Sequence, residues 1–122
     1  MKYLLLIYTN PPTWAHPTHH YQEVSDDLRE QMDKEFEELM GEISGSGELV
    51  DAAPLAAPQN TKTFKVREGA LSMTDGPFAE VKEQLAGFFI LDCETPERAQ
   101  EIASRFPDWR FGAIELRPYY SG

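Results

Sequence analysis

Three histidines, His16, His19 and His20, lie within five residues of one another and are the only histidines in the chain. A His-x-x-His spacing can give a zinc ion two imidazole ligands, but no cysteine lies nearby and a Glu-x-x-His helix motif is missing. Polar histidines in a loop are more commonly exposed to solvent than bound to a metal. The sequence therefore predicts no metal site and no cofactor.

A second group that could do chemistry is Asp75, which begins the run Asp75-Gly76-Pro77. Its carboxylate can accept backbone N–H groups of a turn, while Gly and Pro supply the backbone angles that a turn needs. This structural role is the commoner one for Asp before Gly. The alternative is a pocket residue, because binding and catalytic groups are often carried by loops on a rigid scaffold.

The composition limits the classes of protein. A chain of 122 residues fits a single domain over residues 1–122, and its formal charge of −10 disfavours nucleic acid and anionic membranes as partners. The apolar run from Tyr3 to Tyr8 is too short for a signal peptide or a membrane span, which predicts a cytoplasmic protein. The single cysteine, Cys93, lies in an apolar run and is expected to be a buried, inert thiol.

Hydrophobic periodicity places the elements that must position these groups. Apolar residues spaced three and four apart from Val24 to Ile43 predict a long helix, with Ser25 as a cap and Gly45 and Gly47 at its end. Thr95 and Pro96 predict the start of a second helix, which Pro107 ends. The predicted strands are 2–8, 48–53, 61–67 (half-buried), 70–73, 87–93 and 109–118. The connection from Pro11 to Tyr21 is predicted to be a loop.

This order predicts an α+β fold, a ferredoxin-like sandwich with an antiparallel sheet and two helices on one face. The strands at 2–8 and 87–93 are apolar on both faces, yet two helices can cover only one face. We therefore expect a homodimer that forms through the sheets.

The run from Thr74 to Phe89 resembles the signature of the DGPF family of YCII-related domain proteins. In that signature an Asp-Gly-Pro-Phe turn precedes Ala-Glu-x-Lys-Glu-Gln and a strand with a small residue followed by aromatic residues. The resemblance covers nearly the whole chain, from the Met-Lys-Tyr-Leu-Leu-Leu-Ile-Tyr start to the Glu-Leu-Arg-Pro end. It implies a dimeric α+β barrel, but it implies no particular reaction.

The resemblance also implies a catalytic pair, because Pro17-Thr18-His19 looks like the Pro-x-His that precedes the first helix in some YCII-related proteins. His19 would then be a general base, oriented by the carboxylate of Asp75 or Asp108. The family places its Asp before a Pro, whereas this chain has Pro107-Asp108. The other pocket candidates are Tyr8, Lys82, Glu83 and Arg117, and the alternative for Lys82 and Glu83 is an ion pair.

Two functions follow from the resemblance. The first is the binding of a small organic molecule in a cleft between sheet and loop, with a cofactor-free isomerase or lyase as its catalytic form. The second is a non-catalytic regulatory or interaction protein linked to an extracytoplasmic-function sigma factor, with Glu35, Glu38 and Glu42 on its docking face. The sequence leaves open the ligand and whether the protein is an enzyme.

Overall fold

The computed structural model of the chain describes residues 1–9, 25–78 and 83–121. Its strands are β1 Lys2–Thr9, β2 Leu49–Pro54, β3 Lys62–Arg67, β4 Ala70–Asp75, β5 Gln84–Asp92 and β6 Gly112–Pro118. Its helices are α1 Asp26–Ser46 and α2 Pro96–Arg105, and two short 3-10 turns are η2 Pro58–Asn60 and η3 Pro107–Arg110.

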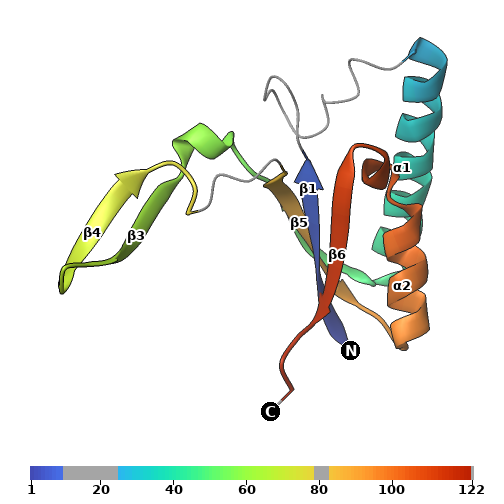
Figure 1. The fold of residues 1–122 in the computed structure, drawn as a ribbon. Helices are drawn as coiled ribbons and strands as arrows, with labels where there is room; N and C mark the ends of the chain where they lie inside the picture. The colour runs from blue at the N-terminus through green and yellow to red at the C-terminus, as the bar shows by residue number, and fades with distance from the viewer. Residues whose placement is uncertain (10–24, 79–82, 122) are drawn as a thin grey trace.

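Four of the strands form one antiparallel sheet in the order β2–β5–β1–β6 (Figure 1). β1 lies in the middle and pairs with β5 on one side and with β6 on the other. A bulge between Ile7 and Tyr8 shifts the register with β5, so that Tyr8 lies opposite Leu85. This strand order, with its two helical crossovers, is the ferredoxin-like α+β sandwich that the sequence predicted.

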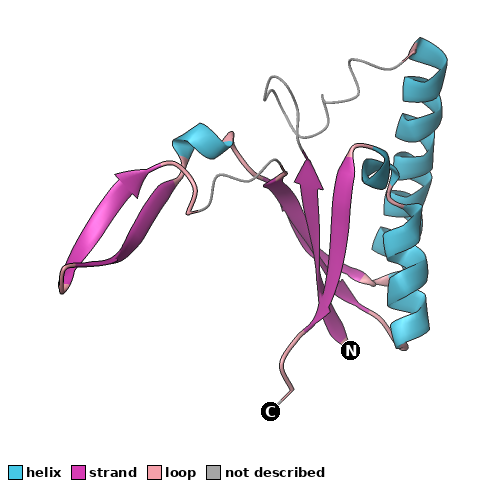
Figure 2. Ribbon diagram, in the orientation of Figure 1, coloured by secondary structure: helices cyan, strands magenta, loops and turns pink. Residues whose placement is uncertain are grey.

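Both helices pack against the same face of this sheet (Figure 2). β1 turns Tyr3, Leu5 and Ile7 toward them, and all three are buried because successive strand residues point to opposite faces. The rest of the buried cluster comes mainly from the two helices and β5 and includes Leu39, Ile43, Ala86, Leu91, Ala99, Ile102 and Phe106. The rings of Phe89 and Phe106 meet edge to face with centroids 4.8 Å apart, and Phe36 packs on both.

The predicted helix ends are confirmed. The Ser25 side chain accepts the Leu28 N–H at 3.2 Å at the start of α1, and Gly47 ends that helix in a left-handed conformation. Thr95 caps α2 in the same way by accepting the Arg98 N–H at 3.1 Å. Neither of these two described helices is long and apolar enough to cross a membrane.

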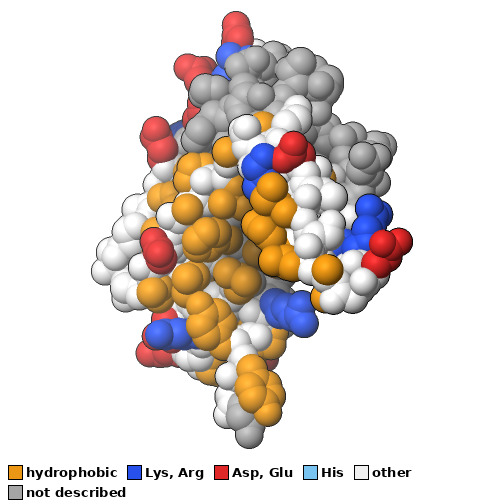
Figure 3. All heavy atoms as spheres, turned by 90° about the vertical axis from the view of Figure 1, so that its left-hand side faces the viewer, with side chains coloured by type: hydrophobic (Ala, Val, Ile, Leu, Met, Phe, Trp, Pro, Cys, Tyr) orange, Lys and Arg blue, Asp and Glu red, His pale blue; other side chains and the backbone are white. Residues whose placement is uncertain are grey.

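The other face of the sheet is also apolar, and both helices lie on the far side from it (Figure 2). Leu4 and Leu6 of β1 point to this face, where the register places them beside Ile90 and Phe88 of β5. All four side chains are only partly buried. Figure 3 views this face directly and shows hydrophobic side chains gathered across it.

β3 and β4 pair only with each other and project from the sheet on its uncovered side (Figure 1). The exposed fractions of Phe64 and Val66 are 61% and 71%. The strand predicted over 61–67 is present as β3, but the prediction that it is half-buried is wrong for a single chain. The alternation of these residues identified one apolar face correctly. In the described residues no second layer packs on that face, because the hairpin extends beyond the main sheet.

The predicted strand from Trp109 to Pro118 is wrong in its first residues, because Trp109 lies in η3 and β6 begins at Gly112. Pro107 opens this short turn, and the Phe111 N–H closes it on the Asp108 carbonyl at 3.0 Å. β6 then approaches β1 so closely that a Cβ on Gly112 would lie 2.0 Å from the carbonyl oxygen of Tyr8. Only glycine permits that approach.

We expect Gly76→Ala to lower the free energy of unfolding by about 1–3 kcal/mol, because Gly76 has a φ of 94° that other residues rarely adopt. A Cβ at Gly76 would meet no atom within 4 Å, so the backbone conformation alone sets this cost. Chemical denaturation measures the effect. Gly41→Ala in α1, where a Cβ also meets nothing, is the matched control and should raise stability by about 0.5–1 kcal/mol. A Gly76→Ala protein as stable as wild type would show that this turn does not need glycine.

Candidate functional site

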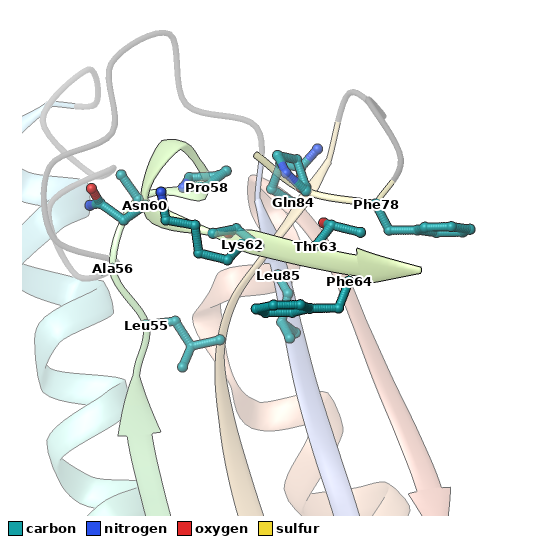
Figure 4. A pocket seen from close by; sticks show the side chains of 13 residues that line it. Leu55, Ala56, Pro58, Asn60, Lys62, Thr63, Phe64, Phe78, Gln84 and Leu85 are labelled. Carbon is teal, nitrogen blue, oxygen red and sulfur yellow. The ribbon is translucent and has the colours of Figure 1, made fainter. Parts of the chain in front are cut away.

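A cavity of about 650 Å³ lies at the base of the hairpin (Figure 4). Three segments form it: the chain from the end of β2 through η2 into β3, the residues after β4, and the start of β5. Its apolar side chains include Leu55, Pro58, Phe64, Phe78 and Leu85. Its polar side chains are Asn60, Thr61, Lys62, Thr63 and Gln84.

Two backbone hydrogen bonds and one side-chain hydrogen bond hold these three segments together. The Leu55 N–H donates to the Ala86 carbonyl at 2.8 Å, which fixes the chain after β2 to β5. The Gly76 N–H donates to the Thr61 carbonyl at 2.7 Å, and the Thr63 hydroxyl donates to the Gly76 carbonyl at 2.7 Å. The turn after β4 is thereby fastened to the start of β3, and the cavity lining is positioned by the main sheet.

Lys62 is the one cationic side chain among the described lining residues, and its ammonium group forms an ion pair with Asp75. Lys62 is the first residue of β3 and Asp75 is the last residue of β4, so the two lie opposite each other at the open end of the hairpin. Their side chains are 54% and 76% exposed, so solvent screens the pair and its contribution to stability is small. Asp75 therefore lies at the edge of the cavity through its contact with Lys62, although its own side chain is not part of the lining.

Tyr8 and Arg117 lie on the uncovered face of the sheet. Tyr8 is opposite the lining residue Leu85, which places it beside the cavity. A hydrogen bond with Glu115, together with burial and the charge of that carboxylate, raises the pKa of the Tyr8 phenol, while the charge of Arg117 opposes this. The phenol is therefore a neutral hydrogen-bonding group at neutral pH.

Of the remaining candidates, two lie in the described part of the chain and two lie outside it. Glu83 is partly buried and directly precedes the lining residue Gln84. Asp108 is buried in η3, which packs against β6 and α1. His19 and Lys82 lie outside the described residues, so their predicted roles stay predictions.

Over residues 1–9, 25–78 and 83–121, no group of three His, Cys, Asp or Glu side chains is arranged to hold a metal ion. The histidine cluster falls outside these ranges, and its metal chemistry is untested. Cys93 is only 2% exposed, and burial raises the pKa of its thiol. The predicted buried thiol is confirmed, and the protonated form is the unreactive one.

Two acidic residues of α1, Glu35 and Glu42, form ion pairs with arginines elsewhere in the chain. Arg98 of α2 holds Glu48 with two hydrogen bonds of 2.8 and 2.9 Å and Glu42 with a third of 2.7 Å. Arg105 also binds Glu42 at 2.7 Å. In addition, Arg110 pairs with Glu35 at 3.4 Å. Two of the three carboxylates predicted for a docking face therefore help to join α1 to the elements beside it.

Among the described residues, none of those predicted for the site is part of the cavity lining. The lining comes from three separate parts of the chain, 55–64, 77–78 and 84–85, and no local motif connects them. One signal was present in the sequence, because Phe64 and Val66 on one strand match Leu71 and Met73 on the next and give the hairpin one apolar face. That face begins at the cavity with Phe64.

A family model identifies the kind of domain. A family model for the YCII-related domain matches residues 1–121. An uncharacterised protein of Rhizobium meliloti (strain 1021) is 32% identical over 94 residues, which are 70% of this chain and 76% of the relative. Among solved structures, 5-chloro-2-hydroxyhydroquinone dehydrochlorinase from Burkholderia phenoliruptrix AC1100, in complex with 2,5-dihydroxybenzoquinone, is 13% identical. The match covers 100% of this chain and 96% of that one, with a TM-score of 0.45.

We predict that Glu42→Gln makes stability less sensitive to acid. Hydrogen bonds from Arg105 and Arg98 lower the pKa of Glu42 from 4.5 to about 2. A carboxylate with a lowered pKa in the folded state stabilises the protein above its unfolded pKa, and this stabilisation is lost as the pH falls toward the folded value. The wild-type free energy of unfolding should therefore fall between about pH 4.5 and pH 2 more steeply than that of Glu42→Gln.

Chemical denaturation at a series of pH values measures this difference. Arg105→Met should reduce the slope in the same direction, and adding it to Glu42→Gln should change the slope less than the sum of the two single effects. Equal slopes for wild type and Glu42→Gln would show that these hydrogen bonds do not form in solution.

Proposed function

The chain belongs to the YCII-related domain family, and from that premise we propose that it binds a small organic anion with an apolar body in the cavity at the base of the hairpin. We further propose that it does so in the cytoplasm as a homodimer. The observation that carries the proposal is the cavity itself, in which a largely apolar wall surrounds a few convergent polar groups. Its volume of about 650 Å³ lies within the usual range for small-molecule sites, roughly 300–1,000 Å³.

Lys62 supports an anionic ligand. Its ammonium group is at the cavity, and its present partner Asp75 is held only by an exposed ion pair. Because solvent-exposed pairs contribute little, a carboxylate or similar group of a ligand can replace Asp75 at low cost. Thr63 and Gln84 add neutral hydrogen-bonding groups, while Phe64 and Leu85 provide apolar contact for the body of the ligand.

The catalytic form of this proposal is a cofactor-free isomerase or lyase. It assigns the general base to His19 and the orienting carboxylate to Asp75, with Tyr8, Lys82, Glu83 and Arg117 as ligand-binding residues. Support for Asp75 comes from its contact with Lys62, and support for Tyr8 comes from its position opposite Leu85.

A second candidate function is an interaction protein, linked to an extracytoplasmic-function sigma factor, that binds a basic partner through α1. The exposed carboxylates of this helix favour it, and they include Asp26, Asp27, Glu30, Asp33, Glu37 and Glu38. An interaction protein of this kind would retain its function when Lys62 is replaced, whereas a small-molecule site at the hairpin would lose affinity.

The ligand site can be tested with benzoate and its neutral analogue benzamide by NMR. Benzoate is expected to shift the backbone amide signals of cavity residues such as Thr63 and Gln84. Lys62→Met should weaken benzoate binding about tenfold through loss of one charged hydrogen bond, and should leave benzamide binding nearly unchanged. Lys34→Met, which removes an exposed lysine from α1, is the matched control and should have no effect. The absence of any shift at cavity residues at millimolar probe would refute the proposed site.

The homodimer is supported by the apolar, uncovered face of the sheet. Sedimentation should give about twice the chain mass of 13.9 kDa at micromolar concentration. Ile90→Glu puts a charge in the middle of this face and should yield a monomer, because an unpaired buried charge is costly. Glu37→Lys on the exposed side of α1 is the control and should remain a dimer. A monomeric wild-type protein would exclude the homodimer.

A further inference from the structure

The hairpin has two chemically different faces, which its register defines. The inner face carries three cross-strand pairs: Lys62 with Asp75 at the base, Phe64 with Met73 in the middle, and Val66 with Leu71 near the tip. The outer face carries Thr63 with Thr74, Lys65 with Ser72, and Arg67 with Ala70. One face is therefore apolar beyond its base, and the other is polar or small.

The apolar inner face is exposed in a single chain. Leu71 is 76% exposed and Met73 is 55% exposed, and Phe64 and Val66 are more than half exposed as well. An isolated two-stranded hairpin is only marginally stable in water, and it normally needs another layer against its apolar side. A contiguous exposed apolar surface of this kind marks an interaction site.

The direction of the hairpin identifies where its partner must lie. The hairpin projects on the side of the sheet that the helices leave uncovered (Figure 1). In Figure 3 its hydrophobic side chains border the hydrophobic face of the sheet. The two surfaces also meet at the cavity, where Phe64 of the inner face and Leu85 of β5 line the same wall. Any molecule stacked on the sheet would therefore also contact the hairpin.

From these positions we propose that the hairpin is a clasp, defined as residues 62–75, which closes over a second copy of this chain and lets the partner complete the cavity. The proposal rests on the homodimer and the cavity proposed above, and it makes the binding site a product of both chains. In a twofold dimer each subunit clasps the other, so one set of contacts is made twice. The partner would cover Phe64, Phe78 and Leu85, three large hydrophobic lining residues that are exposed in one chain.

The exposed area is suited to a dimer. The chain exposes 8118 Å², whereas a folded monomer of 13.9 kDa is expected to expose about 6,700 Å². The excess of about 1,400 Å² is more than the roughly 800 Å² that one subunit contributes to a stable interface of standard size. The projecting clasp contributes to this excess, and contact with a partner would reduce it.

The proposal can be tested with a pair of neighbouring substitutions on opposite faces of the clasp. Leu71→Glu places a charge on the inner face, and Ala70→Glu places the same charge on the outer face beside Arg67. Both residues are exposed, so neither change should alter the fold of the main sheet, which circular dichroism can verify. Sedimentation equilibrium should show the dimer dissociation constant raised at least about tenfold by Leu71→Glu and unchanged by Ala70→Glu.

Benzoate titrations of the same proteins test the clasp separately from the proposed homodimer and the proposed ligand cavity. We expect Leu71→Glu to weaken benzoate binding at concentrations where it is monomeric, and to recover wild-type binding at concentrations that restore the dimer. A wild-type dimer that Leu71→Glu leaves equally strong would overturn the clasp while the sheet dimer stands. Wild-type benzoate affinity in monomeric Leu71→Glu would overturn the shared site while the cavity stands. A wild-type monomer would overturn both the dimer and the clasp.

Discussion

The unequal covering of the four-stranded sheet is the constraint on which the rest of this structure depends. Strand residues alternate between faces, so burying Tyr3, Leu5 and Ile7 under the helices necessarily directs Leu4 and Leu6 to the other side. Two crossovers supply two helices, and both lie on one face. The uncovered face is apolar, and the hairpin projects from the sheet on that same side.

The Asp-Gly-Pro signature contributes to this arrangement chiefly through geometry. The left-handed backbone of Gly76 ends β4 and lets its N–H reach the Thr61 carbonyl, which closes the base of the hairpin. Asp75 is thereby placed opposite Lys62 at the edge of the cavity. A turn-forming role and a pocket role were alternatives for Asp75 in the sequence. In the folded chain Gly76 supplies the left-handed turn, and the Asp75 carboxylate pairs with Lys62, which lines the cavity. The pocket role of Asp75 stays a prediction.

The sequence predicted the order of elements and the helix caps because local chemistry determines them, as at Ser25, Gly47 and Thr95. It misplaced the start of β6, because the close approach at Gly112 depends on β1, a distant segment. It could not show that Phe64 is exposed, since alternation identifies a face but not whether another layer covers it. The residues that line the cavity were missed for a similar reason, because they converge only in the folded chain.

The distribution of cations determines how the two candidate functions can be separated. Arg98, Arg105 and Arg110 form ion pairs with carboxylates of the helical layer, whereas Lys62 lies at the cavity beside a weakly held partner. Reversing the charge of Glu42 would break contacts with both Arg98 and Arg105, so lost function in that variant could not be distinguished from lost stability. Glu38 is exposed on the same helix and offers a cleaner probe of docking. A partner that binds α1 should respond to Glu38→Lys and not to Lys62→Met, and a ligand in the cavity should respond in the opposite way.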